Sequence, residues 1–454
     1  MTIRKRIESL VAWMRGDYSG ANLPRRMFWI AFAVRVLFMT VARKYQMRAH
    51  LDHFEFGWEM GRVARALATG YGYADPFNGH SGPTAWVPPL YPLLLGGVFK
   101  LFGIYSLKSG WVILAINSLL SAAIAPAVYE IGWRCFGRNE RGMKIALWSG
   151  WLWALYPAAI QYAIHWVWEM SLSTALFSWI FVIALRVRGI GSPSNDNASG
   201  QTSRNWGLFG VLWGLLALSN SSLLTFLPFC GLWMIWPEIK LHAGRSLRNA
   251  VLAGACCGII VTPWIVRNWF AFHAFVPMRA NFGAELFESV QLSNRGFPWM
   301  ATLSMAEKDP DFQRYERLGE VAYSKEQGER ANVIIREHPE IFWAHALQRV
   351  YFFWASVPHP IENKLLVEVI REANFSFISL GGLLGLALAL RRRIPGAWLF
   401  FWAFLTVPFV YYFVTVQARF RHPLEPMITV LTVYLFQSAE LPWAPKQGVV
   451  QVHS

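Results

Sequence analysis

The chain has 454 residues, and its composition is that of a membrane protein. Hydrophobic residues make up 55% and charged residues only 15%, whereas a soluble globular chain carries about 25% charged residues. The 24 Trp residues fit the aromatic belts found at membrane–water interfaces. These numbers exclude a disordered chain, a soluble enzyme and a secreted disulfide scaffold.

The apolar runs predict an all-α, polytopic membrane protein with about 10–12 transmembrane helices. No signal-peptide cleavage pattern follows the first run, so we expect it to be a permanent anchor. Two further runs, 87–102 and 340–355, carry prolines or charges and are predicted to lie at the membrane interface. In chain order the predicted spans are 27–42, 109–131, 143–163, 168–185, 206–219, 223–236, 249–266, 374–390, 397–414 and 424–436.

The net charge of +15 is explained by membrane orientation rather than by nucleic-acid binding. With the N-terminus in the cytoplasm, the cytoplasmic segments carry 20 Lys and Arg against 7 Asp and Glu, and the outer segments carry 21 against 20. An excess of Lys and Arg on the cytoplasmic side is the usual pattern. We therefore expect a multi-pass protein of the cytoplasmic (inner) membrane, with both termini cytoplasmic.

Two outer segments, 43–108 and 267–373, are too long to be mere connectors. Long loops on a rigid scaffold commonly carry function. We divide the chain accordingly into a transmembrane module with the first outer loop (1–266), a large outer loop (267–373), and C-terminal helices with a cytoplasmic tail (374–454). The four cysteines lie in or beside predicted spans, which favours packing roles and no disulfide.

The first outer segment begins with three acidic residues at helical spacing. Asp52, Glu55 and Glu59 are separated by three and four residues, so in a helix they share one face. A carboxylate near the lipid headgroups loses hydration, which raises its pKa and suits it to general-base catalysis. The alternative is a solvated helix face or a cap without chemistry.

Several segments together resemble one family, in the family's order along nearly the whole chain. After the acidic residues come a predicted helix that ends GYGY (70–73) and the motif PPLYP (88–92), followed by segments 156–169, 262–279 and 417–426. This pattern resembles the GT-C superfamily of membrane glycosyltransferases. The similarity is to bacterial relatives of the protein O-mannosyltransferases and of the lipid A aminoarabinose transferase.

The resemblance implies a chemistry and a first set of residues. Such enzymes take a sugar from a polyprenyl-phosphate donor at the outer face and transfer it with inversion to a lipid, glycan or protein. The general base falls on Asp52; its neighbour here is His53 rather than a second acid, so Glu55 or Glu59 would supply the second charge. Glu169 matches the second acidic site. Members differ in metal dependence, and because no metal-ligand spacing is visible here we expect no cofactor.

A phosphate leaving group needs fixed cations on the outer side. Arg419 and Arg421, with His422, lie in a short outer turn, and we predict that they bind the donor phosphate, since guanidinium groups bind phosphate in a bidentate manner. Arg267 is predicted to assist them. The alternative for each arginine is an interfacial side chain that reaches the headgroups.

The remaining predicted substrate contacts are spread over both outer loops: Glu59, His80, Tyr91 and Arg279. For His80 the alternative is an ordinary loop residue. For Glu169 it is a charge that favours the start of a helix. Arg35 lies inside a predicted span, where we favour a structural role.

Three classes of function compete. A glycosyltransferase is favoured because the unusual charges gather at the outer ends of helices. A transporter or flippase of a lipid-linked substrate should instead show repeats, interrupted helices and charges near the bilayer midplane. An assembly subunit with a degenerate site is disfavoured by intact Asp52 and Arg419. The expected partners are the lipid-linked donor, membrane lipids and an acceptor that the sequence does not identify; nucleic acid is not among them.

Overall fold

The computed structural model describes residues 22–47, 56–77, 79–137, 139–191, 198–291, 296–297, 309–358 and 365–439. Every regular element in this part of the chain is a helix, and the one isolated β-bridge pairs Ala74 with Pro83. The predicted all-α class is therefore confirmed.

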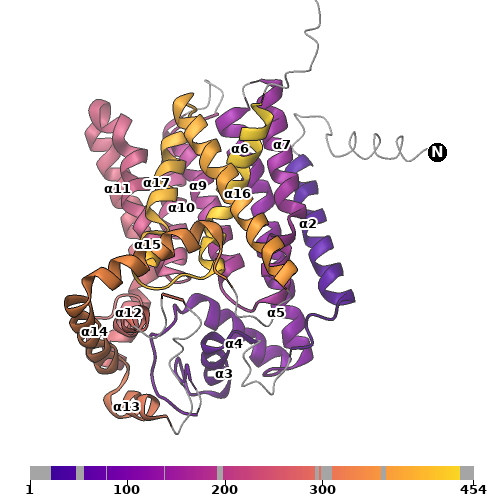
Figure 1. Cartoon of the computed structure of the whole chain (residues 1–454). Helices are drawn as coiled ribbons and strands as arrows, with labels where there is room; N and C mark the ends of the chain where they lie inside the picture. Colours follow the sequence, from indigo (N-terminus) through magenta and orange to yellow (C-terminus); the bar gives the residue numbers. More distant parts are fainter. Residues whose placement is uncertain are drawn as a thin grey trace, which may run out of the picture.

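Most of the long helices stand side by side in one bundle (Figure 1). The bundle pairs α2 with α5, α6 with α7, α9 with α10, α10 with α11, and α16 with α19. Its members are α2 (Asn22–Val41), α5 (Leu107–Ala122), α6 (Ile124–Phe136), α7 (Glu140–Leu155), α8 (Pro157–His165), α9 (Met170–Val187), α10 (Ala198–Ala217), α11 (Leu227–Phe272), α16 (Leu365–Arg391), α17 (Ala397–Thr406), α18 (Phe409–Phe413) and α19 (Glu425–Gln437).

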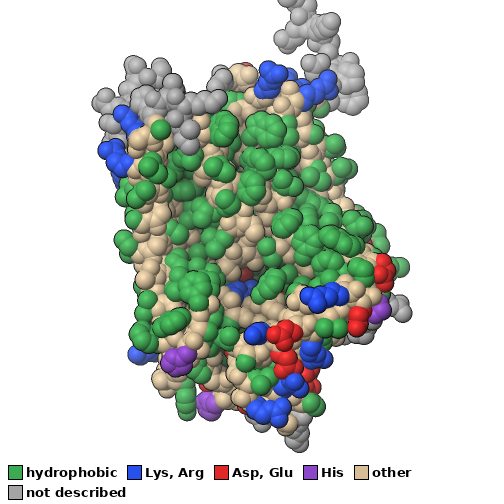
Figure 2. All heavy atoms as spheres, turned by 90° about the vertical axis from the view of Figure 1, so that its left-hand side faces the viewer, with side chains coloured by type: hydrophobic (Ala, Val, Ile, Leu, Met, Phe, Trp, Pro, Cys, Tyr) green, Lys and Arg blue, Asp and Glu red, His purple; other side chains and the backbone are tan. Residues whose placement is uncertain are grey.

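Within the described ranges, four helical stretches are long and apolar enough to cross a membrane: 107–136, 170–187, 243–272 and 365–391. Shorter apolar helices cover 90–102, 221–237 and 397–413. Figure 2 shows the matching surface, a broad apolar region with charged side chains near its two ends. The chain is thus a multi-pass membrane protein, and the total of about 10–12 spans stays a prediction.

Helix breaks occur inside several predicted spans. The run 109–131 is divided into α5 and α6 at Ala123, 143–163 into α7 and α8 at Tyr156, and 397–414 into α17 and α18 before Phe409. Pro157 and Pro408 lie at two of these breaks, because proline cannot donate the hydrogen bond that continues a helix. Residues 237–248, predicted as a connector between two spans, are helical and belong to α11.

Glycines allow two pairs of bundle helices to approach closely. A Cβ atom on Gly210 of α10 would lie 2.1 Å from the carbonyl oxygen of Ala253 in α11. A Cβ atom on Gly385 of α16 would lie 2.2 Å from the carbonyl oxygen of Leu431 in α19. Small residues at helix contacts are the usual means of tight packing in membranes, where apolar burial supplies little force between helices.

The two long loops form a layer at one end of the bundle (Figure 1). We call it the polar layer; α12 packs on α14, and α3 packs on α4. Helix α15 lies across the bundle at its boundary with the polar layer. The elements of the polar layer are α3 (Glu59–Thr69), α4 (Leu90–Phe102), α12 (Phe282–Val290), α13 (Pro310–Leu318) and α14 (Glu320–Glu337), and α15 spans Pro339–Ala355.

Arg35 has a structural environment inside the bundle. Its fully buried guanidinium donates to the carbonyl oxygens of Ala154 at 2.7 Å and Ala31 at 3.0 Å, and to Ser121 Oγ at 3.1 Å. Three acceptors on three helices satisfy a charge that the surrounding apolar side chains could not.

The orientation rule predicts that the polar layer is extracytoplasmic. We expect a cysteine introduced by Glu329→Cys in α14, in a cysteine-free background, to react with a membrane-impermeant maleimide in intact cells. A cysteine introduced by Arg392→Cys, just after α16, should react only after the membrane is permeabilised. Both positions are exposed. The reverse labelling pattern would overturn the orientation.

Candidate active site

The predicted acidic face is only partly within the described residues. Asp52 and Glu55 lie outside them, whereas Glu59 is the first residue of α3. Glu59 is half-buried, and burial raises the pKa of its carboxyl group, with Arg419 and Arg279 acting in the opposite direction. Glu59 therefore lies in a charged environment and not on a solvated helix face.

A sharp turn before α3 brings Glu59 toward the loop that carries Glu169. Gly57 has φ +93°, and a Cβ atom there would lie 2.3 Å from the carbonyl oxygen of Val167. Only glycine tolerates both the backbone conformation and this contact. Because Val167 is two residues before Glu169, the turn places the start of α3 against the second acidic segment.

Glu169 sits at the N-cap position of α9, immediately before that candidate span. Burial raises the pKa of its carboxyl group, and the positive charges of Arg419 and Arg279 partly offset this effect. The charge of Arg419 acts on both Glu169 and Glu59. The structure therefore brings two predicted acidic residues of the site close to Arg419, one of the predicted phosphate ligands.

Arg419 lies in a 3-10 helix, η4 (Ala418–Leu424), and is held by aromatic rings. Its guanidinium carbon is 3.6 Å from the ring centroid of Trp168 and 5.2 Å from that of Phe420. It forms no hydrogen bond or ion pair with another described residue. Burial lowers the pKa of Arg419, and the charges of Glu169, Glu59 and Glu285 oppose this shift.

Sequence reasoning missed two carboxylates on α12, Glu285 and Glu288. Glu285 pairs with Arg279, at 3.5 Å from Oε1 to Nη2. Burial, together with the charges of Glu285 and Glu59, raises the pKa of Glu288 to about 9, so this group stays protonated at neutral pH. The i, i+3 spacing of these two acids in a short, otherwise apolar helix just after Arg279 was the available signal.

Residues 84–86 join the first loop to the large loop. Arg267 donates to the carbonyl oxygens of Thr84, at 2.6 Å, and of Tyr73. Arg279 Nε donates to the carbonyl oxygen of Trp86 at 2.9 Å. The two predicted substrate ligands Arg267 and Arg279 are thus bound to the backbone of the first loop, and Arg279 also acts electrostatically on Glu59 and Glu169.

Glu320, at the start of α14, contacts the same segment. Its buried carboxyl group accepts from Thr84 Oγ1 at 2.5 Å, from the amide of Ala85 at 2.6 Å and from Tyr315 Oη at 3.0 Å. Burial raises its pKa to about 7, although these three hydrogen bonds lower it.

Arg421 and His422 have different partners from Arg419. Both are fully buried and share Glu425: Arg421 Nη2 lies 3.2 Å from Oε1, and His422 Nδ1 lies 3.1 Å from Oε2. Arg421 also donates to the carbonyl oxygen of Phe375 at 3.1 Å and to Ser379 Oγ. The predicted cation cluster is therefore divided between Arg419, beside the carboxylates, and a buried network at the start of α19.

Tyr91 and His80 have different surroundings. Tyr91 is buried and donates to Asn117 Oδ1 at 3.0 Å, near enough to Glu169 to feel its charge. The His80 side chain is 65% exposed, with Nδ1 2.9 Å from Asp75 Oδ2 and its ring tilted against that of Tyr71. The structure does not join His80 to the Arg419 neighbourhood through any contact between described residues.

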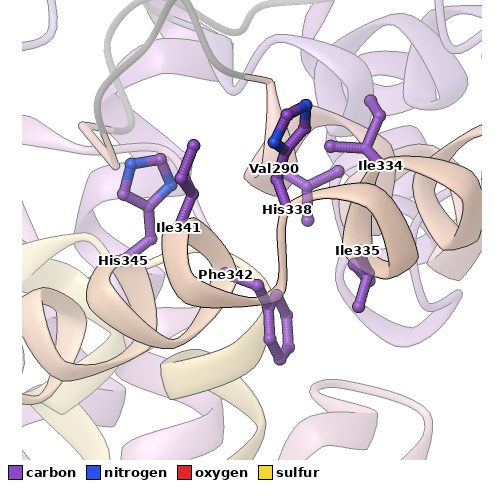
Figure 3. A pocket seen from close by; sticks show the side chains of 7 residues that line it. All are labelled: Val290, Ile334, Ile335, His338, Ile341, Phe342 and His345. Atoms are coloured by element: carbon purple, nitrogen blue, oxygen red, sulfur yellow. The ribbon is translucent and has the colours of Figure 1, made fainter.

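Figure 2 shows a recess between the apolar helices and the polar layer, with acidic and basic side chains visible inside it. A separate dimple between α14 and α15 has apolar walls and two histidines, but no room for a bound molecule (Figure 3). Among the described residues, no three His, Cys, Asp or Glu side chains gather into a metal-binding group.

No protein-family model and no curated protein matches the sequence. Solved structures do: the Archaeoglobus fulgidus oligosaccharyltransferase tethered to an acceptor peptide is 12% identical with a TM-score of 0.51, over 92% of this chain and 50% of that one. Its apo form is 14% identical with the same TM-score, over 91% and 50%. The chain has the GT-C fold.

The chain spans about half the length of these oligosaccharyltransferases. ArnT from Cupriavidus metallidurans, bound to undecaprenyl phosphate, is 15% identical over 92% of this chain and 77% of that one, with a TM-score of 0.37. The oligosaccharyltransferase likeness confirms the fold that the sequence motifs predicted, while the residues of the site rest on the geometry described above.

We expect Glu320 to make stability depend on pH. Because its pKa in the folded protein, about 7, lies above the ordinary value of 4.5, the stabilisation is complete below pH about 4.5 and is lost as pH rises through 7. The loss is at most on the order of 3 kcal/mol. Thermal unfolding between pH 4.5 and 8 should therefore depend less on pH in Glu320→Gln than in the wild type.

Glu326→Gln is the matched control, since Glu326 is on the same helix but pairs with Arg314 near the surface. If Glu320→Gln and the wild type lose the same stability across this pH range, the Glu320 carboxyl group is not the titrating group.

Proposed function

We propose that the protein is an inverting glycosyltransferase that moves a sugar from a polyprenyl-phosphate donor to an acceptor at the outer face of the cytoplasmic membrane. The observation that carries the proposal is Arg419, a half-buried cation without a hydrogen-bonding partner among the described residues, beside Glu169 and Glu59. An unmatched cation next to carboxylates of raised pKa suits a reaction in which phosphate leaves and a proton is removed.

The donor phosphate would bind at Arg419. A guanidinium group that is removed from bulk water interacts strongly with phosphate oxygens and offers two parallel N–H donors. The site joins the polar layer to the apolar bundle, because Glu59 begins α3 and Glu169 caps α9. A lipid-linked phosphate could therefore reach it while its chain stays among apolar side chains. The likeness in fold to an oligosaccharyltransferase supports a transferase of this kind.

The transfer step needs one base and one stabilised leaving group. A carboxylate takes the proton of the acceptor hydroxyl, the acceptor oxygen bonds to the anomeric carbon, and the bond from that carbon to the phosphate oxygen breaks. The electron pair remains on the phosphate, beside Arg419. Attack from the face opposite the phosphate inverts the anomeric carbon.

We assign the base to Asp52, with Glu55, Glu59 and Glu169 as further acids of the site. The segment that carries Asp52 and Glu55 joins the described chain at Phe56, one residue before the Gly57 turn that packs on Val167. Glu59 and Glu169 provide negative charge in that neighbourhood. Negative neighbours raise the pKa of a carboxylate, which moves it toward the range useful for a general base.

The other predicted ligands take supporting roles in this proposal. Arg421 and His422, occupied by Glu425, fix the turn that presents Arg419. Arg267 and Arg279 hold the first loop, and Arg279 is the second cation available to substrate. Tyr91 supports the Glu169 loop through Asn117. His80, exposed on the first loop, would contact only an acceptor that extends over the polar layer.

Asp52→Asn keeps shape and hydrogen bonding but cannot accept a proton. General-base assistance is worth about 100- to 10,000-fold, so we expect Asp52→Asn to lose most transfer with nearly unchanged folding and donor binding. Glu55→Gln, Glu59→Gln and Glu169→Gln should cost less if they act only through charge. Near-normal turnover of purified Asp52→Asn would exclude this residue, and inactivity of Glu55→Gln alone would move the role there.

Arg419→Gln removes the proposed phosphate-binding charge. Hydrogen bonds to charged groups contribute about 1.5–3 kcal/mol, so we expect donor affinity to fall by about 10- to 150-fold, with Arg419→Lys restoring part of it. Arg314→Gln, in a surface ion pair of the polar layer, is the control. Unchanged donor binding and turnover in Arg419→Gln would contradict the proposal, and lipid-linked sugar transport without transfer would favour a flippase.

A further inference from the structure

We propose that Trp168 is a positioning residue, whose indole face fixes the guanidinium plane of Arg419 for the donor phosphate. The inference rests on the proposed function, because it assumes that Arg419 binds that phosphate. Trp168 was not among the residues that the sequence motifs singled out for the site.

The contact itself is a close cation–π stack. The guanidinium carbon of Arg419 lies 3.6 Å from the Trp168 ring centroid, and Arg419 comes from η4 whereas Trp168 lies two residues before α9. η4 and α9 are in contact. A cation at this distance over an indole is attracted by the negative face of the ring, most strongly where water is excluded.

The indole of Trp168 also packs against a neighbouring ring. The rings of Trp166 and Trp168 are stacked, with centroids 5.1 Å apart and an interplanar angle of 3°. The Trp166 carbonyl oxygen accepts from Asn117 Nδ2 at 3.2 Å, and Asn117 Oδ1 accepts from Tyr91 at 3.0 Å. A support that is tied to two other helices can hold the guanidinium plane in one orientation.

Other arginines at this end of the bundle use their N–H donors, even where a ring also lies against them. The guanidinium carbon of Arg421 is 3.2 Å from the Phe375 ring centroid, and that of Arg267 is 5.2 Å from the Trp264 ring centroid. Arg421 is paired with Glu425, Arg279 with Glu285 and a carbonyl oxygen, and Arg267 with carbonyl oxygens of the first loop. Each of those contacts uses N–H donors. An aromatic face stabilises the charge of Arg419 without using its N–H groups, which leaves them available to phosphate oxygens.

The same short segment places the acid. Glu169 follows Trp168 directly and is acted on by the charge of Arg419. The position of Trp168 therefore sets the phosphate-binding cation and the second acid relative to each other.

The test measures binding of undecaprenyl phosphate to the purified full-length protein, together with donor and acceptor KM and kcat. The variants are Trp168→Leu, which removes the aromatic face, Trp168→Phe, which keeps a smaller one, Arg419→Gln, and Trp398→Leu as the control for loss of an exposed indole on α17. Melting curves of all variants verify folding.

We expect Trp168→Leu to weaken undecaprenyl phosphate binding and raise the donor KM by about 10- to 30-fold, with acceptor KM unchanged. Trp168→Phe should recover most of the loss, and Trp398→Leu should match the wild type. If Arg419→Gln loses binding but Trp168→Leu does not, the role of Trp168 is refuted and the proposed function stands. A loss in Trp168→Leu that Phe does not restore, or that falls equally on the acceptor, also refutes it. If the wild type does not bind the lipid, or Arg419→Gln binds it equally well, the proposed function fails instead.

Discussion

Hydrogen bonds between residues 84–86 and three charged side chains determine how the site is assembled. This short segment receives hydrogen bonds from Arg267 in the last turns of α11 and from Arg279 beyond it, and donates to Glu320 at the start of α14. The segment is followed closely by α4, where Tyr91 donates to Asn117, which in turn donates to the loop before Glu169. Hydrogen bonds of buried charged groups are costly to lose. These contacts therefore tie the two loops together.

Charge balance at the site follows from that arrangement. Glu59, Glu169 and Glu285 come from three separate segments and act on the charge of Arg419, and Glu288 lies near Glu285 and Glu59. Protonation of Glu288 relieves part of the repulsion, since a carboxyl group among like charges keeps its proton. Among the described residues, Arg419 has no carboxylate within hydrogen-bonding distance, and a buried charge without such a partner favours binding of an anion.

The sequence was sufficient for the class and the fold. Composition identified the membrane protein, and motifs in a fixed order predicted the GT-C fold. The motifs also singled out Glu169, Arg419 and Arg279, which lie within electrostatic reach of one another, and their roles stay predictions. The sequence could not show that Arg419 and Arg421 have different surroundings, because the motif did not reveal that this turn is a 3-10 helix, in which residues two apart lie on different faces. Nor could it show Glu320 holding Ala85, which is 235 positions away, or an indole in place of a carboxylate beneath Arg419.

Donor binding and base strength are coupled in the proposed mechanism. In the unliganded protein the charge of Arg419 lowers the pKa of Glu169 and Glu59 against the effect of burial. A phosphate bound to Arg419 compensates that charge and brings further negative charge near both carboxylates. Their pKa values must then rise, because both changes disfavour the ionised form. The carboxylates would become stronger bases when the donor arrives, so that binding the leaving group prepares the site to remove the acceptor proton.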